Sequence, residues 1–138
     1  SNNKYTKPIK YKKQRVLSSI LQKVSGSYAL TDSYVWRYLF SVKFIKKHKL
    51  KFDTKLIAQE DTIFVLNAIA LANKIVTVPY VYYHYMFNQD SALNNRDAAH
   101  HARVKQQYKI GKQYRRDFAK KYKIMRLWKL RKLINLFR

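Results

Sequence analysis

The chain contains no cysteine, and only two glycines and two prolines occur in its 138 residues. Without cysteine, disulfides, thiol nucleophiles and Cys-type zinc sites are excluded. So few breakers favour long helices and exclude a sandwich of short strands with a turn every ten residues or so. No run of about 18 apolar residues is present, so the sequence predicts no membrane-spanning helix.

Acidic residues are also scarce, because 7 Asp and Glu face 30 Lys and Arg, which gives a formal net charge of +23. A charge of this size indicates an anionic partner, and nucleic acid, anionic lipid headgroups and nucleotide-sugar phosphates all fit. The composition is 47% hydrophobic and 15% aromatic. The chain can therefore fill a core and is not a disordered polycation.

Hydrophobic spacing predicts an α+β fold that is mainly helical, with a short strand pair. The expected helices cover residues 13–24, a stretch from cap candidates at 31–33 to residue 47, and residues 61–72, 96–122 and 124–137. The expected extended segments, rich in β-branched residues or tyrosine, cover residues 75–78 and 81–85. Ser25-Gly26-Ser27 is expected to end the first helix, and Gly111 to weaken the long one. The expected organisation is a flexible lead-in (1–12), a central segment (13–95) and a basic helical region (96–138).

One acidic pair stands out in this basic chain. Glu60 is the only glutamate, and with Asp61 it forms the only pair of adjacent acids. The pair opens an apolar run, so it can serve as an ordinary helix cap at the positive end of the helix dipole. Alternatively, a carboxylate in positive surroundings can take a proton from a hydroxyl beside an anionic leaving group. Position alone favours the cap.

Five motifs follow one another between residues 30 and 93. They are a Trp-led stretch at Trp36, a Phe after basic residues at Phe52, Glu60-Asp61-x-x-Phe64, a small residue before Lys74-Ile75, and a Tyr-rich stretch at 82–85 followed by Ser91. Together they resemble the second half of family 2 glycosyltransferases, the GT-A enzymes that build bacterial capsular and cell-surface polysaccharides. This resemblance favours the catalytic interpretation of the acidic pair over the cap.

The resemblance implies the acceptor-side half of a GT-A α/β fold and an inverting sugar transfer. Asp61 would be the catalytic base and Glu60 its neighbour in the acceptor site; the donor would be a nucleotide sugar and the acceptor a saccharide or lipid-linked saccharide. The metal-binding Asp-x-Asp of the family does not occur here. A divalent metal, Mg or Mn, and the donor-binding half are therefore expected outside this segment, which alone should be inactive. Arg37-Tyr38 and Met86 also depart from the Asn-Lys and Arg that the family often has.

Aromatic and polar residues around these motifs are candidates for binding substrate. The resemblance implies this role for Trp36, Tyr83, His84, Tyr85 and Ser91. Tyr83 and Tyr85 would form a sugar-stacking wall, and His84 would contact the leaving diphosphate. The alternative for the aromatic residues is core packing. No metal site is expected at His100-His101, because adjacent helical residues point about 100° apart.

The predicted C-terminal helix is basic and amphipathic. Its candidate membrane-binding residues are Arg126, Trp128, Lys129, Arg131 and Lys132. Such a helix can lie in the headgroup layer of an anionic membrane, or it can pack on the domain and leave its charges in water. With a lipid-linked acceptor, the resemblance implies a cytoplasmic protein at the inner face of the cell membrane.

A basic helical module that binds nucleic acid is the alternative function. The Lys and Arg faces of residues 103–132 would contact phosphates, and exposed tyrosines would stack on bases. Its binding would weaken steeply as salt rises. It is the less favoured alternative, because the apolar helix over 61–72 is typical of a core and no known nucleic-acid motif occurs.

Overall fold

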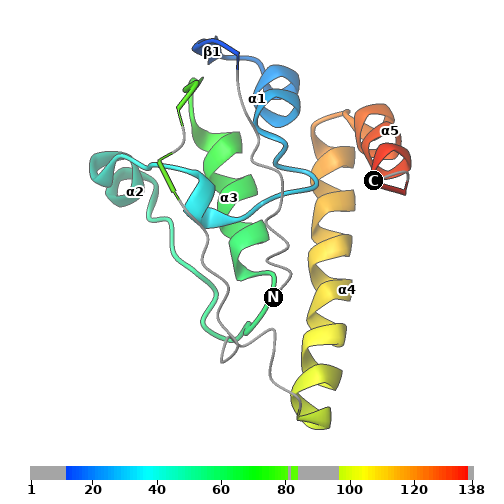
Figure 1. The fold of residues 1–138 in the computed structure, drawn as a ribbon. Coiled ribbons are helices and arrows are strands. Elements are labelled where there is room, and N and C mark those ends of the chain that lie inside the picture. Colours follow the sequence, from blue (N-terminus) through cyan, green and yellow to red (C-terminus); the bar gives the residue numbers. More distant parts are fainter. Residues whose placement is uncertain (1–11, 81, 84–96, 137–138) are drawn as a thin grey trace, which may run out of the picture.

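The structure is a computed structural model that describes residues 12–80, 82–83 and 97–136, with side chains up to residue 130. It has the mainly helical α+β character expected from the sequence (Figure 1). The elements are β1 (Arg15–Leu17), α1 (Ile20–Ser27), the 3₁₀ turn η1 (Val35–Arg37), α2 (Val42–His48), α3 (Glu60–Leu71), β2 (Ile75–Thr77), α4 (Ala98–Lys121) and α5 (Met125–Leu136). In this described part of the chain, no helix is both long and apolar enough to cross a bilayer.

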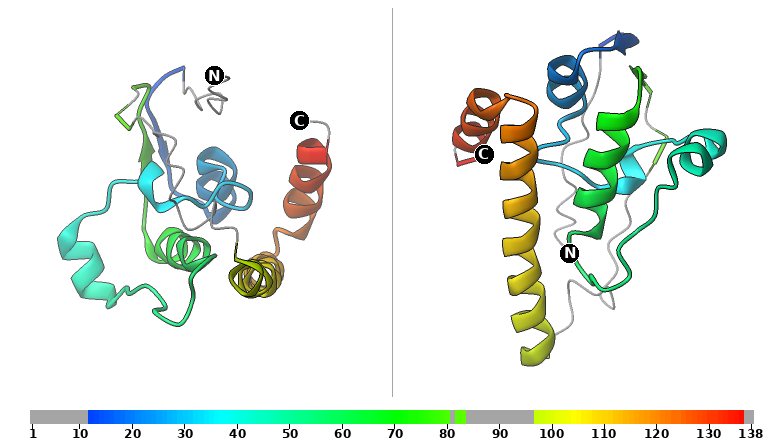
Figure 2. Two further views of the ribbon diagram at one scale, coloured as in Figure 1. Left: turned by 60° about the horizontal axis from the view of Figure 1, so that its bottom comes forward. Right: turned by 180° about the vertical axis from the view of Figure 1, so that it is seen from behind.

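Helix α3 is the centre of the core, as its nearly continuous apolar sequence predicts. Val65 and Leu66 are fully buried, and the cluster around them takes Val24 from α1 and Phe118 from α4. Helix α4 runs alongside α3 in the same direction, and its first turns extend beyond the start of α3 (Figures 1 and 2). Residues from both sides of position 96 therefore share one core.

The first helix begins and ends later than predicted, so both bounds of the expected helix over residues 13–24 are wrong. Arg15–Leu17 is a strand, and α1 starts only after Ser19. Ser19 accepts a hydrogen bond from the Gln22 backbone while the Gln22 side chain accepts from Ser19. This capping box fixes the start of the helix. Gly26 does not end it, because the helix continues to Ser27 and closes at Tyr28 in the left-handed conformation.

The predicted second helix is also wrong, because two short elements replace it. Thr31 and Ser33 do not cap a helix; their hydroxyls donate to the carbonyls of Tyr28 and Ala29. The backbone is helical for only three residues in η1 and then extended at Tyr38. Helix α2 starts afresh after Ser41, whose hydroxyl accepts the Phe44 N–H at 3.5 Å. None of its residues is buried.

The two short strands form an antiparallel pair in which Val16 lies opposite Val76. The β-branched run predicted a strand over residues 75–78, and β2 covers three of these residues. Its partner is β1, which lies in a stretch predicted to be helical. A second extended segment was predicted over residues 81–85. Tyr82 and Tyr83 have no regular structure, and residues 81, 84 and 85 lie outside the described part. The long helix and the C-terminal helix lie where they were predicted.

A buried lysine ties α1 to the end of α3. The Lys23 side chain is 5% exposed, and its Nζ donates to the Ala72 carbonyl at 2.5 Å. Burial lowers the pKa of Lys23 below its ordinary value. A cation at the negative end of a helix dipole offsets part of this desolvation. The contact holds the C-terminal end of α3, opposite the acidic pair, against α1.

Candidate functional site

The acidic pair forms the first turn of α3. The N-cap is Gln59, which has a φ of 71° and makes no side-chain cap hydrogen bond, so neither acid caps this helix. Instead, Oδ2 of Asp61 accepts the backbone N–H of Val35 at 3.1 Å. This bond fastens the loop that carries η1 to the start of α3. The Asp61 carboxylate therefore has a defined orientation beside that loop.

Glu60 is half-buried and poorly solvated. Its Oε2 is buried and has no hydrogen-bond partner among the described residues. Burial raises the pKa of the Glu60 carboxyl, and the neighbouring Asp61 charge adds to the rise, while its own backbone N–H opposes it. A buried polar atom without a partner costs stability. The two carboxylates, adjacent in sequence, thus lie in different environments.

Glu60→Gln is expected to stabilise the protein at neutral pH. The folded-state pKa is raised, so the unfolded carboxyl ionises first and folding loses stability as pH rises through the interval above 4.5. Glutamine removes this loss, and the two proteins should converge in stability below the ordinary pKa. Urea unfolding at neutral and acid pH measures the difference. Asp117→Asn, which removes an exposed acid, is the control, and a Glu60→Gln effect independent of pH would contradict the assignment.

A guanidinium from α4 clamps the turn that carries the acids. Nη1 of Arg115 donates to Oε1 of Gln59 at 2.8 Å, and Nη2 donates to Oγ1 of Thr62 at 2.7 Å. The side chain of Arg115 is largely buried, and burial lowers its pKa. About two turns earlier in α4, Oε1 of Gln107 accepts the N–H groups of Ile57 and Ala58, both at 2.8 Å. Helix α4 therefore positions the acidic turn from outside.

Three aromatic rings lie beside the acidic turn. The Trp36 ring stacks with Tyr34, with centroids 5.3 Å apart, and with Tyr83, with centroids 4.9 Å apart. The Arg37 guanidinium lies 5.8 Å from the Trp36 ring centre and 3.7 Å from Asp32. Because Trp36 already contacts two rings, the half-exposed Tyr34 and Tyr83 offer the free surface. A stacking platform would use these two tyrosines, with Trp36 holding them in place.

The remaining predicted residues are only partly described. His84, Tyr85 and Ser91 lie outside the described residues, as do the side chains of Arg131 and Lys132. Arg126 and Lys129 are exposed, as a membrane contact requires. Trp128, however, packs against the core, as the packing alternative expects. The Trp128 side chain is therefore used in packing within the protein.

Three residues of this region were not found from the sequence. They are Tyr34, Gln59 and Arg115. Arg115 is one cation among many on a polar helix, and its role depends on the packing of α4 against α3. The one available signal was that Gly111 lies a turn before Arg115, because glycine within a helix often marks a close approach.

The described residues contain no cluster of three or more His, Cys, Asp or Glu side chains that could hold a metal. His100 and His101 have ring centres 6.3 Å apart at the start of α4. No family model, curated protein or solved structure matches this chain.

Proposed function

We propose that this chain is the acceptor-side segment of a family 2 glycosyltransferase of the GT-A type, acting in the synthesis of a cell-surface polysaccharide. The observation that carries the proposal is the hydrogen bond from the Val35 N–H to Asp61. It joins the loop bearing Trp36 to the acidic turn, so a carboxylate and stacking surfaces occur in one region. Sugar-binding sites need both, a polar group to orient a hydroxyl and a flat apolar surface.

In the proposed reaction Asp61 is the base. Its carboxylate takes the proton from an acceptor hydroxyl while that oxygen forms a bond to the anomeric carbon of the donor. The bond from that carbon to the diphosphate breaks, and the nucleoside diphosphate leaves from the opposite face, which inverts the configuration. A base must lie within about 3 Å of the hydroxyl it deprotonates. Tyr34 and Tyr83 would support the ring of the acceptor.

Glu60 has a supporting role in this proposal. Burial raises the pKa of the Glu60 carboxyl, and enzymes often use such a raised pKa to hold a proton on a carboxyl group beside the base. Arg115 is a positioning residue that orients the turn through Gln59 and Thr62. The donor and its divalent metal would bind to a part of the enzyme outside this segment, since the chain has no Asp-x-Asp.

The proposal predicts that this chain alone transfers no sugar. Joined to a donor-binding half, it should transfer sugar. Transfer from a panel of nucleotide sugars, measured by release of nucleoside diphosphate, tests it. Two proteins are compared: the isolated chain, and a longer protein that also includes the segment encoded naturally upstream of it. A preceding sequence without a strand-rich domain and an Asp-x-Asp would contradict the proposal, and so would turnover by the isolated chain.

Nucleic-acid binding is the second candidate, and the exposure of α4 favours it. Its lysines and arginines at positions 103, 105, 109, 112 and 116 are exposed, and Tyr108 is 48% exposed. Such a surface can bind phosphates and stack on bases. Nucleic-acid binding leaves the half-buried acidic pair without a role, which is why sugar transfer is preferred.

A further inference from the structure

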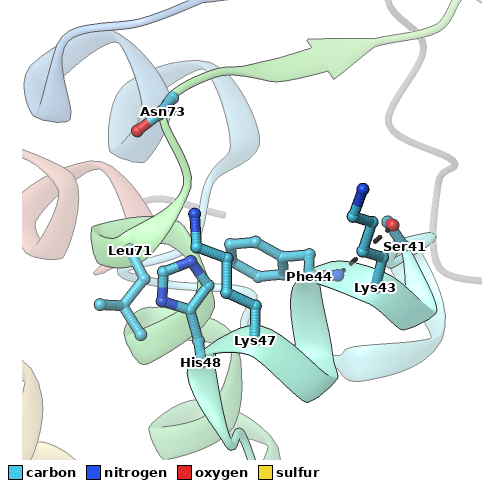
Figure 3. Close-up of a pocket in the computed structure, with 7 residues that line it drawn as sticks. All are labelled: Ser41, Lys43, Phe44, Lys47, His48, Leu71 and Asn73. Carbon is cyan, nitrogen blue, oxygen red and sulfur yellow. Dashed lines mark hydrogen bonds between the residues drawn. The ribbon is translucent and has the colours of Figure 1, made fainter.

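A pocket lies at the end of α3 opposite the acidic pair. Its volume is about 270 Å³, and it lies between α2 and the stretch joining α3 to β2 (Figure 3). It is lined by Ser41, Lys43, Phe44, Lys47, His48, Leu71 and Asn73. At ~1.5 Å per residue, the 12 residues of α3 separate it from the acidic turn by roughly 15 Å or more. It is therefore distinct from the candidate site described above.

Helix α2 presents two different rows of side chains to this pocket. Lys43 and Lys47 are four residues apart and rise from the same side of the helix (Figure 3). Phe44 and His48 form a second such pair, with ring centres 4.7 Å apart. Residues four apart on a helix are neighbours, and two like charges there destabilise it slightly. An anion between the lysines would remove that repulsion.

Within the part of the chain that the structure describes, no carboxylate is paired with these lysines. The residues that line the pocket include no carboxylate, and the stretch 42–51 carries five lysines, one histidine and no acid. Among the described residues the one ion pair is Arg37–Asp32, on another loop. Lys43 and Lys47 are exposed, and α2 packs against the buried core through Ile45. The packing of α2 on the core therefore does not require lysines at positions 43 and 47.

We propose that this pocket binds a phosphate monoester that carries a flat apolar group. The phosphate oxygens accept from the ammonium groups of Lys43 and Lys47, and Asn73 lines the pocket from the stretch after α3 (Figure 3). Phosphate offers more acceptor oxygens than a carboxylate and matches two separate ammonium donors. Phe44 and Leu71 provide the apolar surface for the organic group. The volume is just below the usual range for drug-sized ligands, roughly 300 Å³ upward, so the group is small.

Titration with phenyl phosphate, followed by NMR on the whole chain, tests this site. We expect saturable shifts confined to the pocket, including the Asn73 side-chain amide and the His48 ring. The double variant Lys43→Gln/Lys47→Gln should weaken binding about tenfold or more, since each loss of 1.4 kcal/mol is tenfold. The control Lys12→Gln/Lys13→Gln removes the same charge from exposed residues that do not line the pocket, and it should change binding less than twofold. Equal losses in the two double variants would show that bulk charge alone attracts the ligand and would overturn the proposal.

A further variant separates the contribution of the aromatic ring from that of the lysines. Phe44→Leu should weaken phenyl phosphate but leave inorganic phosphate unaffected, and equal effects on both would overturn the role of the ring. Asn73→Ala lies outside α2 and tests the site if the helix variants do not fold.

Displacement experiments identify the source of the phosphate group. If vesicles containing phosphatidic acid displace phenyl phosphate, the source is a lipid headgroup. Displacement by free phosphate monoesters alone would identify a soluble ligand, and both results support the site. The test does not depend on sugar transfer, so it can succeed where the proposed function fails.

Discussion

Asp61→Asn is expected to lower the turnover of sugar transfer by about 10²–10⁴-fold in the enzyme that contains this segment, since that is the usual contribution of a general base. Asparagine has the same shape, and its amide oxygen can still accept the Val35 N–H. The loop with its aromatic rings should therefore keep its place. Because a base acts on the transition state, kcat should fall with little change in KM for the acceptor. Initial rates of nucleoside diphosphate release measure both constants.

Two variants make this result specific. Asp117→Asn removes an exposed carboxylate on α4 and should leave kcat within twofold of the parent enzyme. Glu60→Gln should slow transfer less than Asp61→Asn while stabilising the protein at neutral pH. If Asp61→Asn turned over normally, the acidic pair would be structural and the glycosyltransferase proposal would lose its base. If Glu60→Gln were the more damaging change, the two carboxylates would exchange roles.

The part of the fold that the sequence predicts well is the part that local pattern determines. Helix α3 is apolar on nearly every face, and β2 is a β-branched run ended by a proline, so each could be assigned from its own residues. The start of α1 could not be assigned in this way. Val16 has the spacing of the following helix but pairs with Val76, some 60 residues away in the sequence. That pairing overrides the local pattern, and it cannot be predicted from the residues near Val16 alone.

The candidate site divides in the same way. Glu60 and Asp61 were recognisable because adjacent acids are rare in so basic a chain. Arg115 was not, because its partners Gln59 and Thr62 lie more than 50 residues earlier in the sequence. Trp36 was assigned as a candidate platform, and the stacking of Tyr34 and Tyr83 on it follows only from the loop conformation. The residues proposed to carry the chemistry could be recognised in the sequence. The residues that position them could be recognised only once the packing of the helices was known.

Gly111→Ala is expected to destabilise the protein by about 1–3 kcal/mol, the usual range for overpacking. Local propensity alone predicts the opposite, because alanine in a helix interior is favoured over glycine by about 1 kcal/mol. The difference arises because Gly111 is buried where α4 crosses the start of α3. A Cβ at position 111 would lie 2.7 Å from Cγ of Gln59. Gln59 cannot move aside without breaking its hydrogen bond to the buried Arg115.

A double-mutant cycle separates the clash from the propensity. In a Gln59→Ala background the obstructing side chain is absent, so Gly111→Ala should become stabilising by about 1 kcal/mol. Urea unfolding of the four proteins gives both values, and the exposed Ala102→Gly variant calibrates the propensity of this helix. Equal effects in the two backgrounds would show that Gln59 does not fill this space. A reversal of sign would mean that a glycine, in a chain that has only two, lets α4 approach closely enough for Arg115 to reach the acidic turn.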